Sequence, residues 1–347
     1  MDGFKRDDVS RDWESDTSSP EGCGDIARQL IESLESGKLS FAMGGGRSNF
    51  RTVENGGKRL DTDLITEFVN TGGNILETGE ELEYWDFSDK TLALFSDSHM
   101  EYELSRVQDT TRSRQPSLSD MTKQALRKLK TSDQGYVLMV EGGRIDHAHH
   151  MNQAKRALAE TLELENAVTA ALEMTSREDT LIIVTADHSH SITFNGYAER
   201  GNNILGTFID TQRKYFVHQN QTHTGEPSPY TTISYANGPG FYNHFNASSG
   251  LWRDLSSVDT TTDEFQQLSS FYLDYETHGG EDVPVYAVGP GAHLLTGVHE
   301  QSYIAHIISY SVCLTHSSLQ CPPATSQASH VYTGSALLSI FFVCSFL

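Results

Sequence analysis

Carboxylate and imidazole side chains are concentrated in one short segment, residues 139–150, which reads MVEGGRIDHAHH. Asp146 and His150 are four residues apart, so one helical turn or a tight loop can direct both toward a single ion. A pair at this spacing is often only a surface salt bridge, but further imidazoles accompany it here. Oxygen and nitrogen donors without a cysteine favour zinc or magnesium over a thiolate site. The segment therefore predicts a metal site.

A second segment repeats the arrangement, because Asp187 and His188 directly follow the apolar run 181–186. The first segment follows a similar run that begins at residue 135, and both runs are typical of buried strands. In an open α/β sheet, functional groups gather at the carboxyl ends of strands, so the two segments meet if the strands are close. His278 lies on a glycine-flanked turn before a third apolar run and is the natural third ligand.

Spacing alone leaves the roles of four other side chains open. Glu141 ends the first apolar run, where a hard carboxylate suits magnesium with retained waters. His147, His149 and His190 can each be a ligand, a hydrogen-bond partner behind the ligands or a packing residue. For His190 we favour the hydrogen-bond role.

The net charge of −22 argues against nucleic acid as a partner, since a phosphate backbone requires a basic surface. A phosphorylated substrate would also be repelled at long range. Bound divalent cations can make such a site locally positive where the chain as a whole cannot.

Apolar periodicity and capping residues predict an α/β fold, with a mostly parallel central sheet flanked by helices and a smaller inserted surface subdomain. Asp25 is the expected cap of the first helix, and Ser117 with Asp120 form an expected capping box. We expect helices at 26–36, 61–69, 116–130, 151–175 and 301–314, and strands at 39–43, 74–76, 92–95, 135–141, 181–186, 231–235 and 283–288. The helix at 151–175 is expected to bury Ala154, Leu158, Leu162, Val168 and Leu172.

The chain divides into five regions by composition and pattern. These are a disordered or truncated start at 1–20, an α/β metal-binding core at 21–192, an inserted surface subdomain at 193–276, a return to the core at 277–321, and a lipid-anchor signal with an apolar tail at 322–347.

The two ends of the chain give different indications about export. The first residues are charged and contain no secretory signal peptide. The apolar run at 336–347 is too short to span a bilayer, whereas small residues at 324–329, a polar spacer and this tail match a GPI attachment signal. A buried C-terminal helix is the alternative. We expect an anchored protein on the extracellular face of the cell membrane.

Cysteines and sequons agree with export. Cys313 and Cys321 are near enough in sequence to close a small loop, while Cys23 has no evident partner. Asn220 and Asn246 lie in glycosylation sequons.

In their order along the chain, these motifs resemble the animal, membrane-anchored alkaline phosphatases. The resemblance is carried by 140–150 (VEGGRIDHAHH), 185–190 (TADHSH) and 277–282 (THGGED), and it extends through most of residues 21–321. It implies hydrolysis of phosphate monoesters through a phosphoserine intermediate, with two zinc ions, one magnesium ion and a homodimer when the chain is complete. By resemblance, one zinc is held by Asp146, His150 and His278, part of a second by Asp187 and His188, and magnesium in part by Glu141.

The sequence departs from this family pattern in two respects. The Asp-Ser-Ala run that supplies the nucleophilic serine is absent, and Asp97-Ser98 is followed by His99. Calcium is doubtful, because Ser96 and Gln115 stand where animal members have carboxylates. We therefore expect an N-terminally incomplete phosphatase that is inactive alone. The alternatives are a phosphodiesterase or sulfatase of the same superfamily, or a non-catalytic, anchored zinc-binding surface protein.

Overall fold

The computed structural model describes residues 24–111, 114–132, 135–208, 229–311 and 338–344, which fall into two compact units, residues 1–124 and 125–347. Several predictions concern residues outside these ranges. They are the disordered start, the partner of Cys23, the sequon at Asn220, the pairing of Cys313 with Cys321, and the anchor attachment region.

The first unit contains a parallel three-stranded sheet in the order β1-β3-β2. Its strands are β1 (Phe41–Gly44), β2 (Asn74–Leu76) and β3 (Thr91–Leu94), and its helices are α1 (Ile26–Glu35), α2 (Leu64–Asn70), α3 (Gly79–Glu83) and α4 (Glu103–Arg106). Two short 3-10 turns, η1 (Arg47–Asn49) and η2 (Val53–Asn55), follow β1. Asp25 caps α1 as predicted. The predicted start of α2 was too early, because the side chain of Asp63 accepts from the Thr66 amide and begins the helix there.

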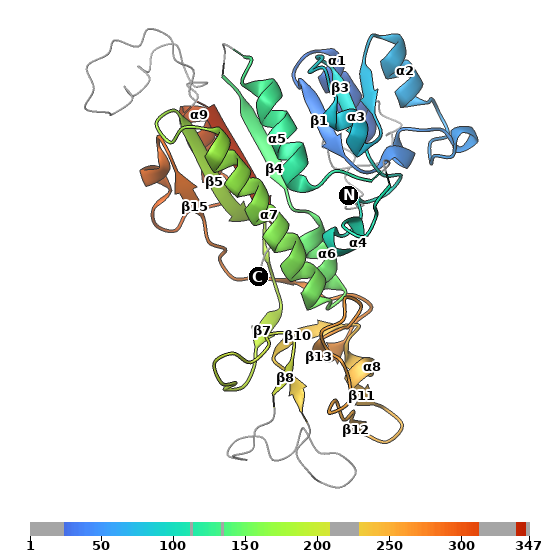
Figure 1. Cartoon of the computed structure of the whole chain (residues 1–347), viewed down its shortest axis with the longest axis vertical. Helices are drawn as coiled ribbons and strands as arrows, with labels where there is room; N and C mark the ends of the chain where they lie inside the picture. Colours follow the sequence, from blue (N-terminus) through green and yellow to red (C-terminus); the bar gives the residue numbers. More distant parts are fainter. Residues whose placement is uncertain (1–23, 112–113, 133–134, 209–228, 312–337, 345–347) are drawn as a thin grey trace. The chain divides into compact units, whose positions relative to one another are not determined.

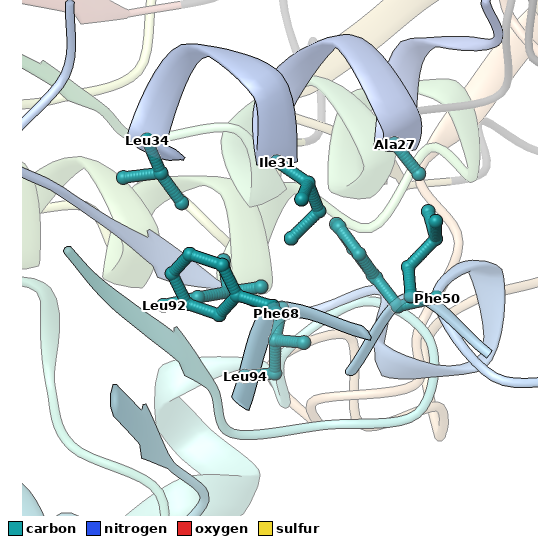
Figure 2. Close-up of a cluster of buried hydrophobic side chains, with 8 residues drawn as sticks. Ala27, Ile31, Leu34, Phe50, Phe68, Leu92 and Leu94 are labelled. Carbon is teal, nitrogen blue, oxygen red and sulfur yellow. The ribbon is translucent and has the colours of Figure 1, made fainter. Parts of the chain in front are cut away.

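One cluster of buried apolar side chains in the first unit lies between α1 and the sheet, and another includes Trp85 and Phe95. Ile31 and Leu34 of α1 face Phe68 of α2 and Leu92 of β3, and Figure 2 shows these side chains converging. Burial of each such side chain contributes roughly 1.5–3 kcal/mol. The apolar spacing of α1 therefore produces its packing against β3.

A buried ion pair ties the start of α1 to the loop before α2. The Nη1 and Nη2 atoms of Arg59 donate to both carboxylate oxygens of Asp25 at 2.9 and 2.7 Å, and Nη2 also donates to Asp61. The side chains of Arg59 and Asp25 are only 7% and 4% exposed. Removing one member of such a pair leaves an uncompensated buried charge.

We predict that Arg59→Met lowers the free energy of unfolding of the first unit by about 3–5 kcal/mol, because Asp25 keeps its charge but loses its partner. Hydrogen exchange of the β3 amides measures this. Arg28→Met is the matched control: Arg28 pairs with Glu67 at 3.3 Å but both side chains are partly exposed, so a loss below about 1 kcal/mol is expected. Equal losses in the two variants would contradict the prediction.

The second unit is built on a four-stranded sheet in the order β15-β5-β16-β4. Its strands are β4 (Val137–Glu141), β5 (Thr180–Ala186), β15 (Tyr286–Val288) and β16 (Leu338–Cys344). β16 runs parallel to both neighbours, while β15 is antiparallel to β5. In register, Val343 stands beside both Glu141 and Thr185, so β16 extends to the strand ends that precede the predicted metal segments.

Helices lie on both sides of this sheet, as Figure 1 shows, with α7 (Ala154–Met174) crossing in front and α9 (Tyr303–Ser311) behind. Leu181 and Ile183 of β5 pack against Leu295 of the 3-10 turn η3 (Ala292–Leu295) and Ile307 of α9. The helix α5 (Leu118–Leu129) begins with the predicted capping box, in which Ser117 Oγ accepts from the Asp120 amide at 3.1 Å. The α/β class with parallel strands is confirmed.

Two predictions about burial were wrong in part, although Ala154 is buried as expected and Leu158 packs beside it. β4 is not buried throughout: Val137 and Met139 are exposed, while Leu138 and Val140 are buried, so only one face of this strand is covered. The buried stripe of α7 is formed mainly by small residues, and Leu162 is 59% exposed. Its buried residues are Ala154, Ala157, Glu163, Leu164, Ala167, Ala170 and Ala171. Alanine allows the close approach of α6 (Arg144–His150), which packs on α7.

The region 193–276 contains more strands than the single one predicted there. A sheet in the order β13-β10-β7 combines β7 (Ile192–Phe194), β10 (Ile233–Gly238) and β13 (Leu268–Tyr272). The smaller elements are the pairs β8 (Thr207–Phe208) with β9 (Tyr230–Thr231) and β11 (Phe245–Asn246) with β12 (Leu251–Trp252), and the helix α8 (Phe241–His244). Another short pair, β6 (Ser189–His190) with β14 (His278–Gly279), lies among the predicted ligands.

The apolar C-terminal run contains a strand, β16, rather than the helix considered as an alternative to the anchor signal. Among the described residues, no helix combines the length and the apolar character needed to cross a bilayer.

Candidate metal centre

Three segments of the second unit bring the predicted ligands together. α6 starts at Arg144, just after β4, and places Asp146 and His150 one turn apart, with 3.2 Å between Oδ1 and Nε2. β6 follows β5 and carries His190. β14 pairs with β6 in antiparallel register, so that His278 stands opposite His190. The strands β4 and β5 of the sheet thus lead directly into α6 and β6. β14 is brought to the same place by its pairing with β6.

The Oδ1 atom of Asp146 is the focus of this arrangement. The Nε2 atoms of His190, His150 and His278 lie 3.0, 3.2 and 3.2 Å from it, and that of His188 lies 3.9 Å away. Oδ1 is buried, yet none of the described groups makes a well-directed hydrogen bond to it. A buried anionic oxygen without such a partner is costly unless a cation lies nearby.

Backbone carbonyls fix the orientation of two of these imidazoles. Nδ1 of His150 donates to the carbonyl oxygen of Glu276, and Nδ1 of His188 donates to that of Ser189 at 3.1 Å. In the neutral form, each ring then carries its proton on Nδ1 and directs the Nε2 lone pair toward the cluster. The Nε2 atoms of His150 and His278 are also only 3.2 Å apart, a close approach that a shared cation would favour.

The charges of the cluster perturb its ionisation strongly. Burial opposes ionisation of Asp146, but the imidazoles of His150 and His190 close to its carboxylate hold its pKa well below the ordinary value. Although burial acts in the opposite direction, Asp146 and Glu276 raise the pKa of His190 to about 9. For His278, burial and the charge of His188 lower the pKa. Protons on some of these rings thus balance the carboxylates when no cation does so.

The donor set fits a zinc-type cation. One donor atom each from Asp146, His188, His190 and His278 lies within 4.8 Å of the others, and His150, His190 and Glu276 form a second such group. Carboxylate oxygen and imidazole nitrogen are zinc ligands, and a cation between them would satisfy the buried Oδ1 atom and the facing lone pairs.

Comparison with known proteins identifies the family that shares these features. The alkaline phosphatase family model matches residues 2–314. The chain belongs to the alkaline phosphatase family. It is 38% identical to the human tissue-nonspecific alkaline phosphatase over 96% of this chain and 64% of that protein. It is 41% identical to the rat protein of the same name, over 92% and 62%, and 37% identical to alkaline phosphatase 4 of Drosophila melanogaster, over 88% and 55%. The chain thus spans roughly 60% of the length of these alkaline phosphatases.

Solved alkaline phosphatases share the fold. The enzyme of the Antarctic bacterium TAB5 matches with a TM-score of 0.51 and 20% identity, over 82% of this chain and 63% of that one. A cold-active enzyme from Shewanella sp. matches with a TM-score of 0.51 and 21% identity, over 82% and 68%.

Two of the ligands implied by the alkaline phosphatase resemblance lie at the margin of the cluster. Asp187 is exposed, and its Oδ2 atom lies 3.4 Å from Nε2 of His188. Glu141 ends β4 and is also exposed, but the surrounding protein atoms and the charge of Asp187 raise its pKa. Among the described residues, neither joins the groups of closely spaced donors. A carboxyl group with a raised pKa close to another carboxylate is a site where a cation would bind favourably.

The other histidines of the first metal segment have different neighbours. His149 is buried, its Nδ1 atom lies 2.9 Å from the hydroxyl of Tyr235, and burial lowers its pKa to about 3. The centroid of its ring lies 4.8 Å from that of His190, so His149 packs against a member of the cluster. Nδ1 of His147 instead lies 3.0 Å from Nη1 of Arg144.

Sequence reasoning missed Glu276. This residue is fully buried, and its carboxylate contacts His190 at 2.6 Å. The available signal was its position two residues before His278, but the motif considered began at Thr277, one residue too late.

Ser96 and Gln115, which stand at the positions of the family's calcium carboxylates, each accept a hydrogen bond from a backbone amide. In the first unit, Gln115 Oε1 accepts from the Glu101 amide at 2.8 Å, and the Ser96 carbonyl accepts from the Arg47 amide. The guanidinium of Arg47 itself contacts Asp97 at 2.7 Å and already supplies positive charge to this loop.

Proposed function

We propose that this chain forms the metal-binding part of a phosphomonoester hydrolase site. The observation that carries the proposal is the buried Oδ1 atom of Asp146, with the Nε2 atoms of His150, His190 and His278 within 3.2 Å and no well-directed hydrogen bond from the described residues. Such an arrangement is stable around a divalent cation.

The proposed ions are two zinc ions and one magnesium ion, without calcium. Asp146, His150 and His278 would hold one zinc, Asp187 and His188 part of the second, and Glu141 part of the magnesium site. When bound, these ions would stabilise the oxygens that attack and leave phosphorus. The donor types present agree with these assignments.

The chain's own residues would orient the donors. The carbonyls of Glu276 and Ser189 hold two imidazoles with Nε2 inward. The enclosed carboxylate of Asp146 supplies the central negative charge. Since the chain carries a net charge of −22, a phosphate monoester would be attracted only where bound cations reverse the local sign.

The reaction proposed for the whole protein proceeds through a phosphoserine intermediate, whose serine is missing from this chain. No Asp-Ser-Ala run occurs in the 347 residues, and Asp97-Ser98 is followed by His99. We infer that the residues described here hold and orient metal but do not supply the attacking group.

The remaining proposals concern the context of the whole protein. We propose a homodimer that is attached by a GPI anchor to the extracellular face of the cell membrane. A disulfide between Cys313 and Cys321 and glycans at Asn220 and Asn246 would accompany export. The side chain of Asn246 is exposed at β11, which agrees with its proposed modification.

The test of the proposed function is the metal content of the purified chain. After dialysis against zinc and then against metal-free buffer, we expect one tightly held zinc ion per chain, because Asp146, His150 and His278 are all present. Atomic emission measures the stoichiometry. A folded chain that retains no zinc would contradict the proposal.

A further inference from the structure

Glu276 is a buried carboxylate whose two oxygens both accept hydrogen bonds. Its exposed fraction is 0%, and it accepts three hydrogen bonds of 2.6 Å. One comes from Nδ1 of His190 to Oε2, and two come from the amide and hydroxyl of Ser191 to Oε1. Because hydrogen bonds to a carboxylate are among the stronger ones in proteins, both oxygens are fixed in place.

The backbone of Glu276 contacts a different segment. Its amide donates to the carbonyl oxygen of His150 at 2.8 Å, and its carbonyl accepts from Nδ1 of the same residue. Glu276 therefore binds the end of α6 through its main chain and β6 through its side chain. It also lies two residues before His278 of β14, so it links all three segments that carry the cluster.

We propose that Glu276 is a positioning residue for the metal centre, acting through His190. By accepting from Nδ1, it fixes both the ring and the position of the proton on it. The opposite ring atom, Nε2, is then held 3.0 Å from Oδ1 of Asp146. Carboxylate–histidine pairs of this kind orient the groups that surround a metal. The inference rests on the proposed function only in that the bound ion is zinc.

Glu276→Gln is the direct test, because glutamine has nearly the same shape but only one acceptor oxygen. Its NH₂ group must face either Nδ1–H of His190 or the amide of Ser191, and both of these are donors. In either orientation His190 loses the charged acceptor that holds it, because the amide oxygen is neutral and the NH₂ group cannot accept. We expect its affinity for zinc, measured by competition with a chromophoric chelator, to fall by about 10–100-fold.

Ser191→Ala is the matched control. It removes the hydroxyl that bonds to Oε1 but leaves the contact between Oε2 and His190 intact. If Glu276 acts by positioning His190, this variant keeps the zinc affinity of the unaltered chain. Equal weakening in the two variants would show that Glu276 only stabilises the local fold, and would overturn the proposal.

A second readout needs neither metal nor activity. In the unaltered chain labelled with ¹⁵N-histidine, His190 should show a protonated Nδ1 in the NMR spectrum, and this signal should change in Glu276→Gln but not in Ser191→Ala. An unprotonated Nδ1 in the unaltered chain would overturn the inference even if Glu276→Gln failed to fold. If instead the unaltered chain binds no zinc while Nδ1 is protonated, the proposed function fails and the pairing of Glu276 with His190 stands.

Discussion

A chain in which His278 is replaced by alanine is expected to lose its tightly held zinc. Nε2 of His278 lies 3.2 Å from Oδ1 of Asp146 and 3.2 Å from Nε2 of His150, so it completes the group of donors proposed for the first ion. Loss of an outer hydrogen-bond partner already weakens metal binding by about 10–100-fold, and loss of a direct ligand should exceed that range. Zinc stoichiometry after dialysis and competition with a chelator would measure the effect.

The control for this variant is His293→Ala. His293 is exposed on η3 and belongs to neither group of closely spaced donors found among the described residues. Its replacement should leave zinc binding unchanged. Unchanged zinc binding in His278→Ala, with the fold intact, would remove His278 from the proposed site.

The second large effect concerns turnover. The 347-residue chain, supplied with zinc and magnesium at alkaline pH, is expected not to hydrolyse a chromogenic phosphate monoester above the rate of the buffered metal. The physical reason is that metals and oriented imidazoles cannot replace an attacking serine, and loss of the nucleophile in a hydrolase costs on the order of 10⁶-fold in kcat. The human tissue-nonspecific alkaline phosphatase would serve as the active reference.

His278→Ala also serves as the internal check for this assay. Any turnover that persists in His278→Ala comes from a contaminating phosphatase. Turnover at the rate of the reference that disappears in His278→Ala would show that another residue of this chain supplies the nucleophile. Comparison with a phosphate diester and a sulfate ester would then separate the monoesterase from the related superfamily activities.

The placement of the cluster was predictable because its motifs follow short apolar runs that are typical of buried strands. β5 is buried almost throughout, and the ligands at its end are brought close to those that follow β4. The helix α1 and its N-cap were equally predictable, since Asp25 directly precedes apolar residues at helical spacing. Local signals of this kind depend on neighbours in sequence and need no knowledge of the tertiary contacts.

Other features depend on contacts that the sequence does not encode locally. The leucines of α7 suggested a buried stripe, but Leu162 is exposed because the neighbouring elements pack on the alanine face. Glu276 contacts His190 across 86 positions of sequence, and its role is set by that contact rather than by its own neighbours. The pairing of β16 between β4 and β5 likewise joins segments more than 150 residues apart, which no periodicity reveals.

The strand β16 separates β4 from β5, the two strands that precede the segments of the proposed metal site. With β16 between them, β4 and β5 are held about 9.5 Å apart, two strand separations, and each leads to one of the segments that carry the cluster. The width of a single backbone therefore sets how far α6 stands from β6. Cleavage at a GPI attachment site would release the same residues, so a molecule processed in that way would need another strand in this position to keep its ligands at the same separation.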